Sequence, residues 1–249
     1  MSRRLVAALA CRANSSRLYA KPLQPLAPGV TILSQLVAAL QTFPFVEKIV
    51  LGIAEGDENL VFREVADTLG VAHVFGPEED VLGRVIACAH EGDATDVFRK
   101  TTEDPFFDHA SLEHAWAIHV ANGNDITALD GGPEGLGCEL FTLEALERSH
   151  RLHETVEQLE HVPGYALAHP DGFRLELIRP EPALRRPDLR LTVDNPEDLV
   201  VARAVYETLA DRAPLIPLDA IVDLLDRRPD LTALNARFAS GRTAWPSAD

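Results

Sequence analysis

The chain has 249 residues, of which 46% are hydrophobic and 25% charged, and its mean hydropathy is −0.02. This length suits one α/β domain, and the composition is that of an ordinary globular protein rather than a disordered, fibrous or membrane chain. The formal net charge is −16, with 23 Lys and Arg against 39 Asp and Glu. Most of the surface therefore repels nucleic acid and anionic lipid, and we expect neither as a partner.

The charges are unevenly distributed along the chain. Residues 1–46 contain no Asp or Glu, although they include five cations: Arg3, Arg4, Arg12, Arg17 and Lys21. Guanidinium groups grip phosphate oxygens two at a time. The pattern therefore predicts one cationic corner that binds a small anionic ligand such as a nucleotide.

Three cysteines, Cys11, Cys88 and Cys138, lie far apart and show no C-x-x-C spacing. This disfavours a disulfide framework or a zinc knuckle and predicts a reducing, cytoplasmic location. The apolar run 5–11 is short and is followed by Arg12, so we expect no export signal. No stretch approaches the roughly 18 apolar residues that a membrane helix needs.

Strand and helix patterns alternate in the first hundred residues. The continuous apolar run 5–11 predicts a buried parallel strand. Further strands are expected at 48–53, 71–75 and 95–100, and helices at 31–42, 59–69 and 81–90, the last capped by Asp80. Such βα repeats predict a doubly wound, mainly parallel sheet with its ligand site at the carboxyl ends of the strands. The basic loop 12–21 follows the first strand and is expected to line that site.

The second half of the chain is less regular and predicts a mixed sheet. The expected elements are strands at 139–141, 173–178 and 189–193, and helices at 143–150, 155–169, 196–209 and 217–225. The glycine cluster 131–137 lacks the strand-before, helix-after context of a dinucleotide fingerprint, so we interpret it as a mobile loop. We expect one domain over residues 1–238 and a flexible tail at 239–249.

Six blocks of the sequence resemble the motifs of one family, in the same order. Residues 12–23 (RANSSRLYAKPL) resemble the family's R-M-G-S-T-R-L-P-G-K-x-L, and residues 76–84 (GPEEDVLGR) resemble G-S-E-E-D-V-L-G-R. The others are 99–105 (RKTTEDP), 135–139 (GLGCE), 160–162 (EHV) and 191–199 (LTVDNPEDL). The chain thereby resembles the cytidylyltransferases of the spore-coat-polysaccharide type, relatives of the enzymes that make CMP-activated ulosonic and sialic acids.

This resemblance implies both a fold and a reaction. The implied fold is a single doubly wound, mainly parallel but mixed sheet of the nucleotide-diphospho-sugar transferase type, with a C-terminal helical extension. The implied reaction joins a nucleoside monophosphate, taken from CTP above other nucleoside triphosphates, to a small acidic acceptor and releases pyrophosphate. Mg²⁺ or Mn²⁺ is the implied cofactor, and a homodimer formed through the segment after Gly131 is a further implication.

Matching positions imply which residues form the site. The nucleotide would be bound by Arg12, Asn14, Ser15, Ser16, Arg17, Lys21 and Arg84, with Arg12, Arg17 and Lys21 catalytic. The acceptor would be bound by Arg99, Glu139, Glu160 and His161. The metal would be held by Glu103, Asp104 and Asp194, and Mg²⁺ is usually bound by one or two carboxylates together with phosphate oxygens.

Several positions depart from the family pattern. Asn14 and Ala20 stand where the family has Gly, Tyr19 where it has Pro, Glu103 where it has Asp, and Gly137 where it often has Asp. These departures leave two other functions open. One is the same chemistry with GTP or UTP and a phosphorylated or phosphonate acid, and the other is a nucleotide-binding paralogue without catalysis.

Purely structural roles also compete with the functional ones. The basic loop could be only a solvated surface, and Asp194 could be only a helix N-cap. Glu103 and Asp104 could form a turn before Pro105, and the acids at 78–80 could serve only the dipole of the following helix. Arg84 shares this last interpretation because it lies in the same motif, while Arg99 could be only an ion-pair partner.

Overall fold

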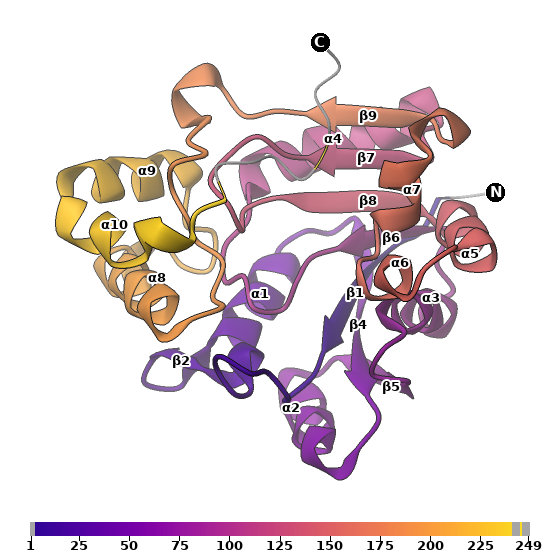
Figure 1. Ribbon diagram of the computed structural model, residues 1–249, viewed down its shortest axis with the longest axis horizontal. Helices are drawn as coiled ribbons and strands as arrows, with labels where there is room; N and C mark the ends of the chain where they lie inside the picture. Colours follow the sequence, from indigo (N-terminus) through magenta and orange to yellow (C-terminus); the bar gives the residue numbers. More distant parts are fainter. Residues whose placement is uncertain (1–2, 241–244, 246–249) are drawn as a thin grey trace.

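The computed structural model describes residues 3–240 and Trp245. Its main sheet is built from β1 (Leu5–Cys11), β4 (Val46–Ala54), β5 (Ala72–Gly76), β6 (Asp96–Arg99), β7 (Ile126–Leu129), β8 (Cys138–Thr142) and β9 (Leu175–Ile178). The seven strands lie in the order β5-β4-β1-β6-β8-β7-β9 (Figure 1). A small hairpin, β2 (Pro25–Ala27) and β3 (Val30–Thr31), stands apart from this sheet.

The sheet is mainly parallel with one reversed strand. β1 pairs in parallel with β4 and β6, and β4 with β5. β8 runs antiparallel to both β6 and β7, and β9 returns to a parallel pairing with β7. The doubly wound, mixed α/β fold expected from the alternating pattern is therefore confirmed.

Ten α-helices of the described chain cover the sheet and extend beyond it. One face packs against α1 (Ile32–Leu40), α2 (Val61–Leu69) and α4 (His109–Asn122), and the other against α3 (Val81–Glu91), α5 (Leu143–Leu152), α6 (Val156–Glu160) and α7 (Gly164–Ala168). The last three, α8 (Pro196–Thr208), α9 (Leu218–Arg227) and α10 (Pro229–Asn235), share a separate apolar core. They form the C-terminal helical extension and lie together at one side of the molecule (Figure 1).

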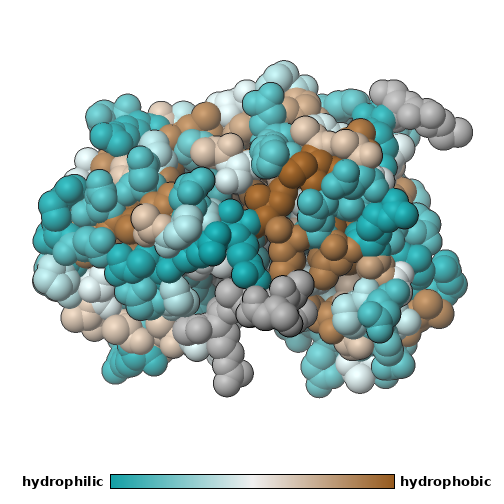
Figure 2. Space-filling view, turned by 90° about the horizontal axis from the view of Figure 1, so that it is seen from above, coloured by the Kyte–Doolittle hydropathy of each residue, from teal (hydrophilic) through white to brown (hydrophobic). Residues whose placement is uncertain are grey.

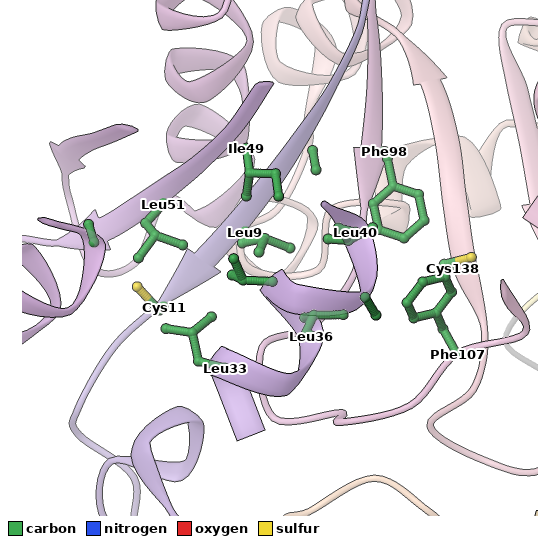
Figure 3. Close-up of a cluster of buried hydrophobic side chains, with 14 of the residues drawn as sticks. Leu9, Cys11, Leu33, Leu36, Leu40, Ile49, Leu51, Phe98, Phe107 and Cys138 are labelled. Carbon is green, nitrogen blue, oxygen red and sulfur yellow. The ribbon is translucent and has the colours of Figure 1, made fainter. Parts of the chain in front are cut away.

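The first strand is buried on both faces, as its continuous apolar run predicts. Leu9 and Cys11 pack with Leu33 and Leu36 of α1 (Figure 3). The alternate residues Val6 and Ala8 belong to the opposite core, with Leu82 and Val85 of α3. Because β1 is central and covered on both sides, its carboxyl end and the basic loop after it have a fixed position.

Two expected elements differ from the structure. The helix expected at 155–169 is divided into α6 and α7, because Pro163 between them lacks the backbone N–H that a continuous helix needs. The strand expected at 189–193 pairs with no strand of the sheet; its Arg190 makes only an isolated bridge with Glu134. The glycine segment 131–137 is thereby attached to the chain just before α8.

Two further expectations concern membrane-spanning helices and the C-terminal tail. Within the residues that the structure describes, no helix has the length and apolar character required to span a bilayer. Figure 2 shows mostly hydrophilic side chains, with an apolar band near the middle of this face and smaller apolar areas elsewhere. Of the tail expected at 239–249, residues 241–244 and 246–249 lie outside the described chain. Trp245 is buried, and its backbone N–H donates to Asp130 Oδ2 at 2.9 Å.

A buried carboxylate makes the stability of the fold depend on pH. Asp96 is fully buried and accepts hydrogen bonds from Arg3 Nε (2.7 Å), Thr95 Oγ1 (2.7 Å) and His119 Nε2 (3.1 Å). Burial alone would raise the pKa of Asp96, but these hydrogen bonds outweigh it and lower the pKa. The folded state therefore binds this proton less readily than the unfolded chain does.

We expect the stabilisation from Asp96 to be complete above the unfolded pKa of about 4 and to be lost as the pH falls from there through the lowered folded pKa. Urea unfolding between pH 7 and pH 3 measures it. Asp96→Asn should flatten part of the decline below pH 4. An unchanged pH slope in that variant would show that other carboxylates account for it.

Candidate active site

A polar pocket of about 190 Å³ opens at the carboxyl ends of β1 and β6, where the fold predicts a ligand site. Four segments line it: the end of β1 with the basic loop, the start of α3, the end of β6 with the segment after it, and α6. The lining includes Arg12, Asn14, Ser15, Lys21, Arg84, Arg99, Glu103 and Glu160. The structure thus brings together members of all three predicted groups of site residues.

The basic loop 12–21 is held in a compact turn by its backbone. The N–H of Ala13 donates to the side chain of the buried Asn59 (2.7 Å), and the N–H of Ala20 donates back to the carbonyl of Ala13 (2.7 Å). Lys21 then begins a short 3₁₀ turn over Lys21–Leu23. The two ends of the loop are therefore close, and the cations between them project from a fixed frame.

Ala20 carries the backbone strain of this turn. Its φ is +47° and its ψ +49°, in the left-handed region that favours glycine, which explains why Gly is the family's residue at this position. Ala20→Gly is therefore expected to stabilise the fold by about 1 kcal/mol, measured by urea unfolding. Ala39→Gly within α1 is the matched control and should destabilise it by about 1 kcal/mol. Destabilisation by both variants would contradict the strain.

The cations of the loop meet carboxylates that are remote in the sequence. Arg12 lies 3.3 Å from a Glu78 oxygen and 3.2 Å from a Glu160 oxygen. Arg17 and Lys21 both reach Oδ1 of Asp194, at 2.9 and 2.6 Å. The lack of acids near these cations in the sequence therefore does not leave them unpaired. Each of these cations is paired with a carboxylate, and an anionic ligand could take the place of that carboxylate.

The other predicted nucleotide-binding residues differ in their surroundings. The Asn14 amide donates to Glu58 (2.8 Å), Ser15 lines the pocket, and Ser16 is exposed outside the pocket lining. Arg84 is buried and donates to the carbonyls of Cys11 (3.0 Å), Gly52 (3.0 Å) and Glu78 (3.2 Å). Burial lowers the pKa of Arg84. Its guanidinium thus ties together the ends of β1 and β4 and the segment before α3, behind the basic loop.

The acidic side of the pocket consists of Glu103, which lines it, and Asp194, which lies outside the lining and pairs with the lining residue Lys21. The carbonyl of Glu103 accepts the N–H of Val193 (3.3 Å), which places these two distant segments together. Burial and the negative charge of the neighbouring Asp104 raise the pKa of Glu103. The charge of Lys21 lowers this pKa, and that of Asp194 raises it further. Burial also raises the pKa of Asp194, but hydrogen bonds from Lys21 and Arg190 and the charge of Arg17 lower it overall.

Asp104 is oriented differently from its neighbour. One of its oxygens accepts hydrogen bonds from Lys100 Nζ (2.7 Å) and Thr101 Oγ1, and its other oxygen is buried without a partner among the described residues. Within the described chain, no three His, Cys, Asp or Glu side chains converge as a metal site. Mg²⁺ is usually held by one or two carboxylates together with phosphate oxygens and water, and Glu103 and Asp194, whose segments are joined by the Val193 N–H to Glu103 carbonyl hydrogen bond, are the carboxylates here of that type.

The four residues predicted at the acceptor lie in two adjoining groups. Arg99 and Glu139 form an ion pair at 3.3 Å, and their charges act on His161. Desolvation, followed by the positive charge of Arg99, lowers the pKa of His161, although its side chain is partly open to solvent. Glu160 instead pairs with Arg12 at the rim. Of these four residues, Arg99 and Glu160 line the pocket, whereas Glu139 and His161 lie behind or beside Arg99, outside the lining.

Sequence reasoning missed the polar residues that support the pocket. Lys100 is buried and donates to the carbonyls of Gly135 (2.6 Å) and Gly137 (2.9 Å). Arg190 is buried and contacts Glu134, Asp194 and Asp198. The glycine segment, interpreted from the sequence as a mobile loop, is thus held on two sides. The one sequence signal that could have pointed to Arg190 was its position four residues before Asp194.

Asp194 is not the cap of the helix that follows it. Asn195 is the N-cap of α8 and forms a capping box with Asp198. The role of helix N-cap that was considered for Asp194 therefore belongs to Asn195. The carboxylate of Asp194 instead faces the three cations Arg17, Lys21 and Arg190.

The chain is similar in sequence to two known proteins over most of its length. No family model matches the chain. It is 27% identical over 224 residues to the spore coat polysaccharide biosynthesis protein SpsF of Bacillus subtilis, covering 88% of this chain and 92% of that protein. It is also 27% identical over 237 residues to an uncharacterized protein of Methanocaldococcus jannaschii, covering 94% and 95% of the two chains.

Solved structures share the fold over most of their length. A cytidylyltransferase from Leptospira borgpetersenii superposes with a TM-score of 0.83 at 20% identity, covering 93% of this chain and 97% of that one. The CMP:2-keto-3-deoxy-manno-octonic acid synthetase, solved with CTP, superposes with a TM-score of 0.64 at 15% identity, covering 82% and 99%. The resemblance drawn from the six sequence blocks is thereby confirmed. The chain is a homologue of the spore-coat protein SpsF and has the fold of the cytidylyltransferases.

Proposed function

We propose that this protein is a nucleotidyltransferase that uses CTP and transfers the CMP group to a small acidic acceptor. An oxyanion of the acceptor attacks the α-phosphorus, a new P–O bond forms, and the bond from the α-phosphorus to the bridging oxygen breaks. Pyrophosphate leaves with the electron pair of that bond. The solved structures named as a cytidylyltransferase and as a CMP:2-keto-3-deoxy-manno-octonic acid synthetase support this class of reaction, and SpsF supports a place in polysaccharide biosynthesis.

The basic loop supplies the charge that this reaction needs. Arg12, Arg17 and Lys21 would bind the β- and γ-phosphates and stabilise the negative charge that develops on departing pyrophosphate. Their present partners are carboxylates, and all but one of those acids are more than 30% exposed at the side chain. Exposed ion pairs contribute only about 0–1 kcal/mol, so a triphosphate can displace the two partners of Arg12 at little cost. The Lys21 side chain is 13% exposed and that of Asp194 20%, so this pair yields only to a stronger anion.

The acidic side of the pocket would hold the cation. We propose that Glu103 and Asp194 bind Mg²⁺ or Mn²⁺, which would supply charge stabilisation to the α-phosphate. Asp104 would act indirectly, because Lys100 and Thr101 occupy one of its oxygens. Catalysis by the chain itself then rests mainly on alignment and on preorganised charge.

The acceptor would lie on the Arg99 side of the pocket. Arg99 would pair with the acid group of the acceptor, and Glu139 would accept hydrogen bonds from its hydroxyl or amide groups. The lowered pKa of His161 favours its neutral form, and one ring nitrogen would then accept a proton from the attacking hydroxyl. Glu160 at the rim would contact whatever part of the acceptor extends past Arg12.

One observation carries the proposal: two cations of an acid-free loop meet Asp194, beside Glu103, at the carboxyl end of the central strand. The test is release of pyrophosphate from CTP, ATP, GTP and UTP with Mg²⁺ and a panel of ulosonic, phosphorylated and phosphonate acids. Release with CTP and one acid supports the proposal. Pyrophosphate release only with GTP or UTP would show that the substrate nucleotide is not CTP. Nucleotide binding without pyrophosphate release from any pair of nucleotide and acid would indicate a binding protein.

A further inference from the structure

The two oxygens of Asp194 have different partners. Oδ2 accepts from Arg190 Nη2 at 2.7 Å, whereas Oδ1 accepts from both Arg17 (2.9 Å) and Lys21 (2.6 Å). Three cations therefore surround one carboxylate that lies at the edge of the pocket. Any cation that binds Asp194 has to compete with them.

Arg190 is fixed in place on the inner side. Its side chain is 5% exposed and also contacts Glu134 and Asp198. Asp198 is fully buried and accepts the backbone N–H of Asp194 (3.1 Å) as well as the side chain of Asn235 (3.1 Å). Moving Arg190 would leave Asp198 buried without a cation, which is costly. Oδ2 is therefore permanently occupied.

Arg17 and Lys21 are placed to move. Arg17 is 53% exposed at the side chain, and Lys21 joins Asp194 through a long stem with rotatable bonds. Both belong to the basic loop that lines the pocket and would turn to a polyphosphate bound there. Oδ1 is therefore occupied only while the pocket lacks a stronger anion.

We propose that Lys21 and Arg17 close Asp194 to free divalent cations until a polyphosphate draws them away, with Arg190 as the positioning residue that keeps Oδ1 directed at the pocket. The inference rests on the proposed function, because it assumes a triphosphate at the basic loop. The ammonium and guanidinium groups compete with a metal ion for one oxygen, and their charges oppose its approach. Polyphosphate and metal then favour each other's binding.

The test is a titration of the protein with Mn²⁺ in the absence of nucleotide, in which electron paramagnetic resonance measures the concentration of free Mn²⁺. Lys21→Met and Arg17→Met should each bind Mn²⁺ roughly 10-fold more tightly than the wild type, within the usual range of site-to-site coupling. Arg12→Met is the matched control, because it removes a cation of the same loop that does not touch Asp194. It should change the affinity less than about twofold. The double variant Lys21→Met/Asp194→Asn should lose the gain.

Two results would overturn the inference. One is unchanged Mn²⁺ affinity in both Lys21→Met and Arg17→Met. The other is equal tightening in Arg12→Met, which would indicate a general charge effect. Thermal melts check that each variant is folded. If Lys21→Met unfolds, Arg17→Met still decides the test, because Arg17 is exposed.

A separate arm tests the function on which the inference rests. Inorganic triphosphate is titrated by calorimetry in EDTA, where no metal takes part. Binding by the wild type that weakens at least 10-fold in Arg12→Met supports the triphosphate cradle. Absence of binding by the wild type would overturn the proposed function, and the metal titration would still decide whether Lys21 and Arg17 close Asp194.

Discussion

Replacing Lys21 by methionine is expected to lower kcat for pyrophosphate release by roughly 10²–10³, the loss that follows removal of one preorganised donor in other enzymes. The ammonium group reaches the mouth of the pocket and lies 2.6 Å from Asp194. It is therefore placed to follow the phosphates as charge develops on them. Because its contribution grows in the transition state, kcat should fall more than KM rises. Initial rates over a range of CTP concentrations separate the two effects.

The control for this variant is Lys48→Met. Lys48 pairs with Glu91 on the surface, and its side chain is 40% exposed, so turnover should stay within about twofold. Arg17→Met should follow Lys21→Met in direction. Full turnover in both loop variants would remove the catalytic role of the basic loop.

Arg190→Met is expected to lower the free energy of unfolding by about 3–5 kcal/mol, because it leaves a buried carboxylate without its cation. Asp198 is fully buried and takes two hydrogen bonds from Arg190. Burial would raise the pKa of Asp198, but Arg190 and the N–H and side-chain groups of Asn195 and Asn235 lower it. Without Arg190, Asp198 must either remain charged at high cost or take up a proton.

Urea unfolding at pH 7 measures the loss, and Arg237→Met is the matched control. Arg237 pairs with Glu197 in solvent with a side chain 69% exposed, so its loss should cost less than about 1 kcal/mol. Arg190→Met/Asp198→Asn should recover part of the stability. Equal, small effects of the two single variants would show that the buried network does not support the fold.

Most of the first half of the fold could be predicted from the sequence. The apolar run 5–11 and the later runs at 48–53 and 71–75 are β1, β4 and β5 to within a few residues. Burial on both faces gives β1 and most of β4 a continuous apolar signal, whereas the edge strand β5 is only partly buried. The same principle predicted the position of the pocket, because parallel strands present their carboxyl ends at one edge.

The second half was harder to predict because its signals are weak. The helix α4 was not expected, since its buried residues Leu112, Ala115 and His119 include only one large apolar side chain. The short strand β7 lies directly after it and has only four residues. The segment 189–193 has an apolar pattern like that of a strand, but its burial comes from packing against the C-terminal helices rather than from pairing.

For the site, the motifs singled out in the sequence come together around one pocket, but side-chain partners are set by distant segments. Glu103 and Asp194 are adjacent in space although remote in sequence, as a shared cation would require. The sequence could not show that Asp104 faces Lys100, or that Arg84 is occupied by three carbonyl groups. These orientations depend on which groups are buried together, and no local pattern records that.

The most direct test is a crystal structure with Mn²⁺ and a CTP analogue that cannot be cleaved between the α- and β-phosphates, with the metal located by anomalous scattering. We expect the triphosphate to lie against residues 12–21, with Arg17 and Lys21 turned from Asp194 to its oxygens. The anomalous peak should lie between the carboxylates of Glu103 and Asp194. A nucleotide bound elsewhere, or a loop whose cations still contact Asp194, Glu78 and Glu160, would contradict the account.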